Sequence, residues 1–215
     1  MWAQHKVKSN YEKYSQVRST SGKTGREVAE EILHANGIYD VDVVKGDGFL
    51  TDHYDPSKKV VCLSPANYDR PSVAGTAIAA HEVGHAIQHQ QGYAFLRFRT
   101  ALVPLANIGS SLSYIIIMAG IFLTALGSAF GSTALWIGAG LMSLAVLFSI
   151  VTLPVEFDAS SRAMKQITAL NIVNEKEYKH ARKVLSAAAM TYVAATATAV
   201  AELVRIILLA RASDN

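Results

Sequence analysis

The residues best suited to chemistry are His81, Glu82 and His85, within the sequence His-Glu-Val-Gly-His. On a helix, residues four apart share a face, so both imidazoles can bind the same metal ion. Glu82 lies about 100° round the helix from His81, beside such an ion, where its carboxylate can accept a proton from a bound water. This pattern predicts a zinc-dependent hydrolase with Glu82 as the general base.

The segment around the motif favours a helix. Residues 72–91 contain no breaker other than Gly75 and Gly84. Ser72 can cap the start of this segment, and Gly92 can supply the left-handed conformation that ends it. We therefore predict a single helix over residues 72–91 that presents both histidines on one face.

Two elements are predicted ahead of this helix. Thr24 and Glu27 have the spacing of a capping box and precede apolar residues at helical spacing, which indicates an amphipathic helix. Two β-prone runs within residues 49–63 flank a strong turn signal at residues 55–58, which predicts a hairpin. If its second strand, residues 59–63, lies at a sheet edge, it could pair with the backbone of an extended peptide.

Much of the remaining chain has the composition of a membrane protein. Hydrophobic residues make up 51% of the 215 residues, and residues 102–126 and 134–153 carry no charge. Each run is long enough to cross a bilayer, so the two predict a transmembrane hairpin. A third candidate span, residues 187–210, contains Glu202 and Arg205, which are costly in lipid unless they pair or face other helices.

Charge indicates orientation and excludes some functions. Arg97 and Arg99 precede the first span and six Lys or Arg residues follow the second, so the positive-inside rule places residues 1–100 and 155–185 in the cytoplasm. The net charge of +3, without an Arg-rich block, argues against a nucleic-acid partner. Cys62 is the only cysteine, which excludes an intrachain disulfide and a zinc site built from cysteines.

A catalytic zinc site normally has three protein ligands and an open water position, so a third ligand is needed. His89 lies too far along a straight helix to join His81 on one ion. Residues near the hairpin turn could approach the site, although nothing in the spacing requires it: Asp52, His53 and Asp55. Glu156 is the better candidate. It directly follows the second span, and a transmembrane hairpin returns the chain to the side on which the active helix ends. A carboxylate there can complete a His₂Glu site.

Other polar residues could support such a site. Asp158 should point away from Glu156 on a helix, and we predict that it contacts a ligand histidine from behind. An oxyanion that develops during hydrolysis also needs stabilising donors. The candidates are His53, Tyr54, Tyr93 and Arg162, each of which could instead be a surface or packing residue.

Four segments are similar to those of a known family: 50–56 (LTDHYDP), 79–89 (AAHEVGHAIQH), 101–110 (ALVPLANIGS) and 156–160 (EFDAS). They resemble the YugP-type neutral zinc metallopeptidases, small bacterial membrane proteins, and the resemblance covers essentially the whole chain. It implies one zinc ion per chain, a location in the bacterial inner membrane, and a further span before Met1.

More distantly, the order of the His-Glu-Val-Gly-His motif, two spans and Glu156 resembles the HtpX-type proteases and the related prenyl-protein protease. The resemblance implies that Glu156 is the third zinc ligand, as in gluzincins. In that wider group an Asp four residues after the Glu supports the site. This chain departs from the pattern, because it has Ser160 there and Asp158 two residues earlier.

We expect a mainly α fold, an integral membrane helical bundle of two to three spans with a small α+β, zincin-like cytoplasmic domain. That domain should contain the hairpin and the helix with the His-Glu-Val-Gly-His motif. The expected segments are a cytoplasmic domain (1–100), a transmembrane hairpin (101–154), cytoplasmic helices with the third ligand (155–185) and a C-terminal transmembrane helix (186–210).

The expected function is that of a multi-pass membrane zinc endopeptidase whose active site faces the cytoplasm. His81, His85 and Glu156 would bind zinc, and the substrates would be peptides or membrane proteins, in quality control or processing. One alternative is a non-catalytic scaffold or protease-associated subunit with a structural zinc, against which the intact Glu82 argues. Another is a hydrolase of non-peptide amides, which the same ligands could support.

Overall fold

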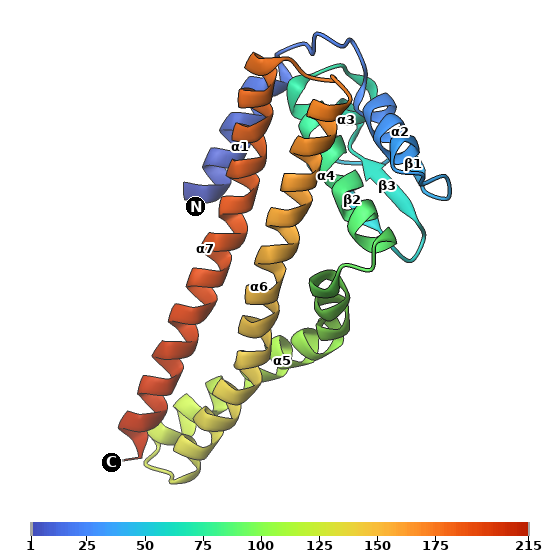
Figure 1. Cartoon of the computed structure of the whole chain (residues 1–215). Helices are drawn as coiled ribbons and strands as arrows, with labels where there is room; N and C mark the ends of the chain where they lie inside the picture. Colours follow the sequence, from blue (N-terminus) through green and yellow to red (C-terminus); the bar gives the residue numbers. More distant parts are fainter. Residues whose placement is uncertain (1, 215) are drawn as a thin grey trace. The chain divides into compact units, whose positions relative to one another are not determined.

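The computed structural model describes residues 2–214 and is mainly helical, with one small sheet (Figure 1). In chain order the elements are α1 (Trp2–Ser15), α2 (Gly25–Ala35), β1 (Asp42–Lys45), β2 (His53–Asp55), β3 (Val60–Leu63), α3 (Pro65–Asp69), α4 (Val73–Gln90), α5 (Ala94–Ala125), α6 (Phe130–Ala169) and α7 (Glu175–Ser213). The expectation of a mainly α fold is confirmed.

The chain divides into two compact units. Unit 1 comprises Met1–Leu96 and Val155–Thr191, and unit 2 comprises Arg97–Pro154 and Tyr192–Asn215. Helices α6 and α7 thus contribute to both units, while the sheet and α1 to α4 belong to unit 1.

The sheet of unit 1 has the strand order β1-β3-β2. Strands β2 and β3 pair antiparallel, with His53 opposite Cys62, which confirms the predicted hairpin. Strand β1 pairs with β3 in parallel, with Val43 opposite Val61. Because β3 has a neighbour on each side, it is not a sheet edge, and the condition we set for its pairing with a peptide is not met. The outer strands among the described residues are β1 and β2.

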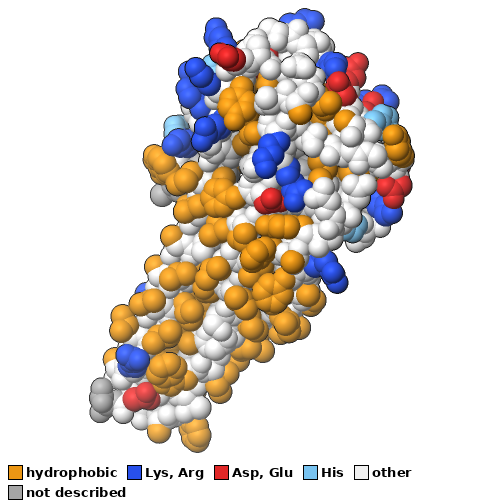
Figure 2. Space-filling view, in the orientation of Figure 1, with side chains coloured by type: hydrophobic (Ala, Val, Ile, Leu, Met, Phe, Trp, Pro, Cys, Tyr) orange, Lys and Arg blue, Asp and Glu red, His pale blue; other side chains and the backbone are white. Residues whose placement is uncertain are grey.

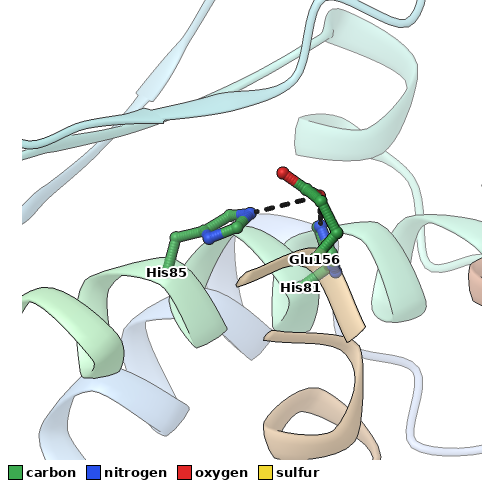
Figure 3. Close-up of side chains that lie close together, drawn as sticks. All are labelled: His81, His85 and Glu156. Atoms are coloured by element: carbon green, nitrogen blue, oxygen red, sulfur yellow. Dashed lines mark ion pairs between the residues drawn. The ribbon is translucent and has the colours of Figure 1, made fainter. Parts of the chain in front are cut away.

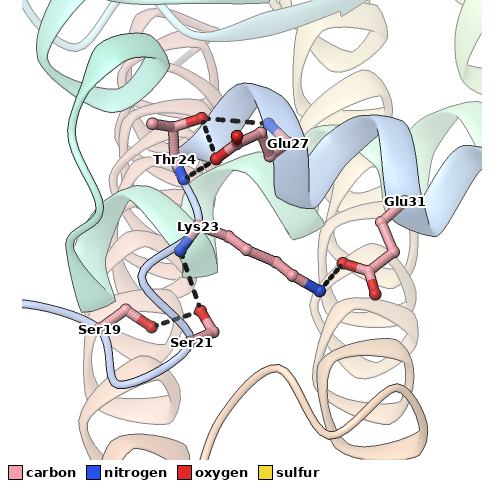
Figure 4. Close-up of polar contacts among 6 residues, drawn as sticks. All are labelled: Ser19, Ser21, Lys23, Thr24, Glu27 and Glu31. Atoms are coloured by element: carbon pink, nitrogen blue, oxygen red, sulfur yellow. Dashed lines mark hydrogen bonds and ion pairs between the residues drawn. The ribbon is translucent and has the colours of Figure 1, made fainter.

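Helix α2 begins with the predicted capping box (Figure 4). The Thr24 side chain accepts a hydrogen bond from the Glu27 backbone N–H at 3.3 Å, and the Glu27 carboxylate accepts one from the Thr24 N–H at 2.7 Å. Two of the orphan donors at the helix start are thereby satisfied. Just before the cap, Lys23 Nζ lies 2.6 Å from a Glu31 carboxylate oxygen, which ties the incoming loop to the helix.

The core of unit 1 is apolar and closely packed around α4. Apolar residues of α2, β3, α4, α6 and α7 form one buried cluster, which includes Ile32, Leu63, Val83, Ile167 and Leu185. Most of α4, including the whole stretch from Glu82 to Gln88, is buried. The two metal-binding candidates on this helix are therefore held by a rigid, enclosed element.

Three helices, α5, α6 and α7, are long and apolar enough to cross a membrane. Hydrophobic side chains gather over their unit 2 parts in Figure 2, and several large ones are exposed, among them Tyr114, Phe122 and Phe130. Glu202 and Arg205, the charged residues of the third candidate span, form an ion pair in which Arg205 Nε lies 2.9 Å from a carboxylate oxygen. The pairing expected of charges in lipid is therefore present.

Candidate metal centre

His81, His85 and Glu156 converge at one point of unit 1 (Figure 3). Their ligand atoms all lie within 4.8 Å of one another. Glu156 Oε2 is 3.3 Å from His81 Nε2 and 3.6 Å from His85 Nε2. The exposed fractions of the three side chains, 14%, 11% and 4%, show that the cluster is largely shielded from water.

Two helices position these groups. On α4, Ser72 caps the start by accepting a hydrogen bond from the Gly75 N–H at 3.0 Å, and the two histidines follow on one face. Glu156 lies on α6, which passes very close to α4. A Cβ atom built on Gly84 would lie only 2.6 Å from the Ala159 carbonyl oxygen. The glycine inside the motif therefore permits the helix approach that brings Glu156 to the histidines.

The second ring nitrogen of each histidine is also engaged. His85 Nδ1 lies 3.0 Å from Gln88 Oε1, and His81 Nδ1 lies 3.1 Å from Ser160 Oγ. When Nδ1 carries the proton and donates it to such a partner, Nε2 keeps its lone pair. In that tautomer each imidazole presents a lone pair at Nε2, the atom that faces Glu156.

Gln88 belongs to a larger hydrogen-bonded network. Its side chain is fully buried, and its amide nitrogen donates to the Val155 carbonyl and to Asp158 Oδ2, both at 2.8 Å. Asp158 in turn lies 2.5 Å from Arg162 Nε. These bonds fix which end of the Gln88 amide faces His85. Asp158 therefore supports the cluster through Gln88 rather than by the direct contact to a histidine that we predicted.

The donor set fits a zinc ion. Two ligand atoms held about 2.0–2.1 Å from a tetrahedral zinc lie roughly 3.4 Å apart, close to the two measured Nε2–Oε2 distances. Two neutral imidazoles and one carboxylate are also a ligand set that zinc uses in catalytic sites. The chemistry of the donor set and the two distances to Glu156 fit zinc, while the three ligand atoms as a group spread over as much as 4.8 Å and would draw together around the ion.

Glu82, the predicted general base, is buried next to this cluster. Burial raises the pKa of its carboxyl group, and this effect outweighs the opposing influence of His81 and His85. For His85, burial is the largest influence and lowers the pKa, but hydrogen bonds to Glu156 and Gln88 and the charges of Glu82 and Glu156 together outweigh it, so the net pKa is raised. Acidic and basic groups thus influence one another's pKa within one largely buried cluster.

Two of the other predicted residues form hydrogen bonds to groups that are not members of the cluster. His53 and Tyr54 lie on β2, where His53 Nδ1 bonds the Thr51 carbonyl and the Tyr54 hydroxyl lies 2.8 Å from His89 Nδ1. Burial, followed by nearby Asp40 and Asp55, raises the pKa of Tyr54 to about 12, so its phenol stays protonated.

Arg162 and Tyr93, two further oxyanion candidates, contact each other. The Arg162 guanidinium lies 5.7 Å above the Tyr93 ring and 2.5 Å from Gln91 Oε1. With its bond to Asp158, Arg162 links the end of α4 to α6.

Gln88 and Ser160 were not predicted as site residues, although the sequence held a signal for each. Gln88 is three residues after His85 and Ser160 is four after Glu156, spacings that place both on the ligand-bearing faces of their helices. A polar residue at such a spacing is a candidate for orienting a ligand.

Comparison with known proteins gives two matches. Residues 1–211 match the model of a family described as "Putative neutral zinc metallopeptidase". The chain is also 45% identical over 208 residues to the "Putative membrane protease YugP" of Bacillus subtilis (strain 168), covering 97% of this chain and 90% of that protein. No solved structure matches. The relative's name and the three apolar helices together indicate a membrane protein.

Proposed function

The chain belongs to the neutral zinc metallopeptidase family, and from that membership we propose that it is a membrane-embedded, gluzincin-type zinc endopeptidase. The observation that carries the proposal is the convergence of His81 Nε2, His85 Nε2 and Glu156 Oε2 beside the buried Glu82. A purely structural metal site has no need of a carboxylate at that place.

In the proposed reaction, His81, His85 and Glu156 hold the metal. Bound zinc would polarise the scissile carbonyl and acidify a water molecule. Glu82 accepts the proton of the attacking water on its carboxylate and passes it to the leaving amine. Gln88 and Ser160 keep the two imidazoles in the orientation that binding requires.

The substrates we propose are peptides or membrane proteins, cleaved on the cytoplasmic side of a bacterial inner membrane. The support comes from chain order and charge. Glu156 follows the uncharged run 134–153 by three residues, and six Lys or Arg residues lie between 162 and 183. An active site adjoining a span suits juxtamembrane segments and processing or quality control.

The proposal is tested by zinc content per chain, measured by mass spectrometry of the element, together with cleavage of casein. Wild type should hold one zinc and cleave. Glu156→Ala should lose the metal, whereas Glu82→Gln should keep it and lose activity by about a hundredfold or more. Glu12→Gln, which removes an exposed carboxylate from α1, is the matched control and should change neither quantity.

The other outcomes are equally informative. Zinc retained in Glu156→Ala would mean that the third ligand lies elsewhere. If wild type and Glu82→Gln both bind zinc and neither cleaves casein, the alternative of a scaffold with a structural metal is favoured. A wild-type protein that holds no zinc would end the peptidase proposal.

A further inference from the structure

A large groove lies between α6 and α7 within unit 1, and it adjoins the metal-binding cluster, because Ser160, whose hydroxyl bonds His81, is among its lining residues. Its volume is about 980 Å³, at the upper end of the roughly 300–1,000 Å³ typical of small-molecule sites. Its walls include Phe157 and Met164 from α6 and Leu185 and Met190 from α7. Phe157 and Met190 are exposed, so the groove offers apolar side chains to an occupant.

The groove also contains two cations without a counterion. Lys165 and Arg182 line it, and neither has an ion-pair partner among residues 2–214. A second cavity of about 560 Å³ adjoins α1 and shares Arg182, to which it adds Lys6, Lys179 and Lys183. Within the described chain, no Asp or Glu lines either cavity. Figure 2 shows Lys and Arg side chains gathered on this part of unit 1.

Polarity changes along the groove in a consistent direction. Phe157 follows the uncharged run 134–153 by four residues, and Met190 lies inside the apolar run 187–210. Lys165 and Arg182 each lie eight residues farther from these runs than Phe157 and Met190, about 12 Å along a helix. The apolar end of the groove therefore adjoins the candidate spans in sequence, and the cationic end is farther from them. The flexible aliphatic stems of Lys165 and Arg182 let their charged ends reach back toward a lipid headgroup.

We propose that this groove binds an anionic phospholipid, with the phosphate at Lys165 and Arg182 and an acyl chain between Phe157 and Met190. Free phosphate would leave the apolar walls unfilled. The groove also offers the hydroxyl groups of Ser160, Ser161, Thr168, Tyr178 and Ser186. An extended peptide could bond these groups, but its backbone would not supply the anionic group that Lys165 and Arg182 favour. A molecule with one anionic end and one long apolar end matches both halves of the groove. Anionic phospholipids have this form and are abundant in the membrane that the apolar runs would cross.

The test uses the full chain in detergent micelles to which phosphatidylglycerol and phosphatidylcholine are added in equal amounts. Native mass spectrometry gives the apparent Kd of each lipid. Lys165→Gln combined with Arg182→Gln removes the phosphate contacts. Lys13→Gln combined with Lys176→Gln removes the same charge from residues that line neither cavity. Ser186→Trp, at an exposed position in the groove, fills it without altering charge.

Wild type should prefer phosphatidylglycerol. Lys165→Gln with Arg182→Gln should weaken its binding about thirtyfold, because each Lys or Arg near an anionic headgroup contributes roughly a factor of five. The control pair should weaken it less than about threefold, and Ser186→Trp should weaken both lipids.

Three results would overturn the proposal: equal affinity of wild type for the two lipids, equal losses in the double variant and its control, or unchanged lipid binding by Ser186→Trp. Displacement of phosphatidylglycerol by an equal concentration of inorganic phosphate would also overturn it, since the site would then recognise the anion alone. None of these measurements depends on zinc or on peptide cleavage, so the proposal stands or falls apart from the peptidase function.

Discussion

The two units differ in where they place polar and apolar side chains. In unit 1 the fully buried Asn67 and Gln88 each have hydrogen-bond partners, as polar groups inside a water-soluble core must. In unit 2 the outward faces carry large apolar side chains such as Tyr114 and Phe130, which are 69% and 75% exposed. Exposed apolar surfaces of this kind, on helices long and apolar enough to cross a membrane, are typical of contact with lipid. Unit 1 thus encloses a few fully hydrogen-bonded polar groups in an apolar core, whereas unit 2 exposes large apolar side chains on its surface.

Glycine substitution should give the largest difference between the units. In unit 1, Gly84→Ala places a Cβ atom 2.6 Å from a backbone oxygen of α6, which must move. We expect a loss of about 1–3 kcal/mol in the free energy of unfolding and a fall in zinc content, because α4 and α6 carry the ligands. In unit 2, Gly140 has open space around it, so Gly140→Ala should leave both quantities nearly unchanged.

Thermal unfolding and zinc analysis of the two purified variants measure these effects. If Gly84→Ala keeps its zinc and its stability, close approach of α4 to α6 is not what holds the cluster together. If Gly140→Ala destabilises the protein as strongly, the contrast between the two positions fails.

Replacement of Gln88 tests whether the polar network of unit 1 serves the site. Gln88→Leu keeps the volume roughly constant but removes the acceptor for His85 Nδ1 and the donor to Asp158. Zinc affinity should fall about 10–100-fold, the usual cost of losing such a supporting contact. Competition with a chelator measures it. Gln90→Leu, at an exposed position on the same helix, is the control and should bind zinc like wild type.

Local sequence signals predicted much of the fold. The caps of α4 place its ends at Val73 and Gln90, one residue inside each predicted boundary, because helix caps depend on neighbouring residues alone. The parallel pairing of β1 with β3 was not predicted. The two short segments are separated by the whole of β2, and their pairing depends on the packing of α2 and α4, which no local pattern encodes.

The site shows the same limit. The spacing of His81 and His85 and the return of the chain through a hairpin were enough to select Glu156, and the structure brings the three together. Ser160 of α6 bonds His81 across the interface of α4 and α6, while Gln88 bonds His85 on its own helix and is held by Val155 and Asp158 of α6. Their spacing from His85 and Glu156 made them candidates, but choosing them over other polar residues required knowledge of which helix faces meet, and that depends on the close approach of α6 to Gly84.

Two Arg–Glu pairs of nearly equal exposure allow a direct comparison of surroundings. Glu30→Gln breaks the Arg26–Glu30 pair on α2, where water replaces the lost contact, so less than about 0.5 kcal/mol should be lost. Glu202→Gln leaves Arg205 unpaired in a candidate span, which should cost about 1–3 kcal/mol.

For Glu202→Gln, a membrane translocation assay measures the fraction of the C-terminal span that is inserted. For Glu30→Gln, unfolding by denaturant measures the change in the free energy of unfolding. If Glu202→Gln has as small an effect as Glu30→Gln, Arg205 reaches water. Residues 187–210 would then not place Arg205 inside the bilayer.

The smallest effect should come from the capping box of unit 1. Thr24→Ala removes the side-chain acceptor for the Glu27 N–H, and the free energy of unfolding should fall by about 1 kcal/mol with zinc content unchanged. Thr24→Ser, which keeps the hydroxyl, should restore stability.

The difference in stability between wild type and Thr24→Ala should also depend on pH. Hydrogen bonds from the backbone and side chain of Thr24 lower the pKa of Glu27 below its ordinary 4.5. A carboxyl group with a lowered folded-state pKa stabilises the protein fully above its ordinary pKa and ceases to do so as pH falls through the folded-state value. The stability gap between wild type and Thr24→Ala, followed by urea unfolding at several pH values, should therefore be constant at neutral pH and narrow below about 4.5. A gap independent of pH would assign the contribution to the Thr24 hydroxyl alone, without Glu27.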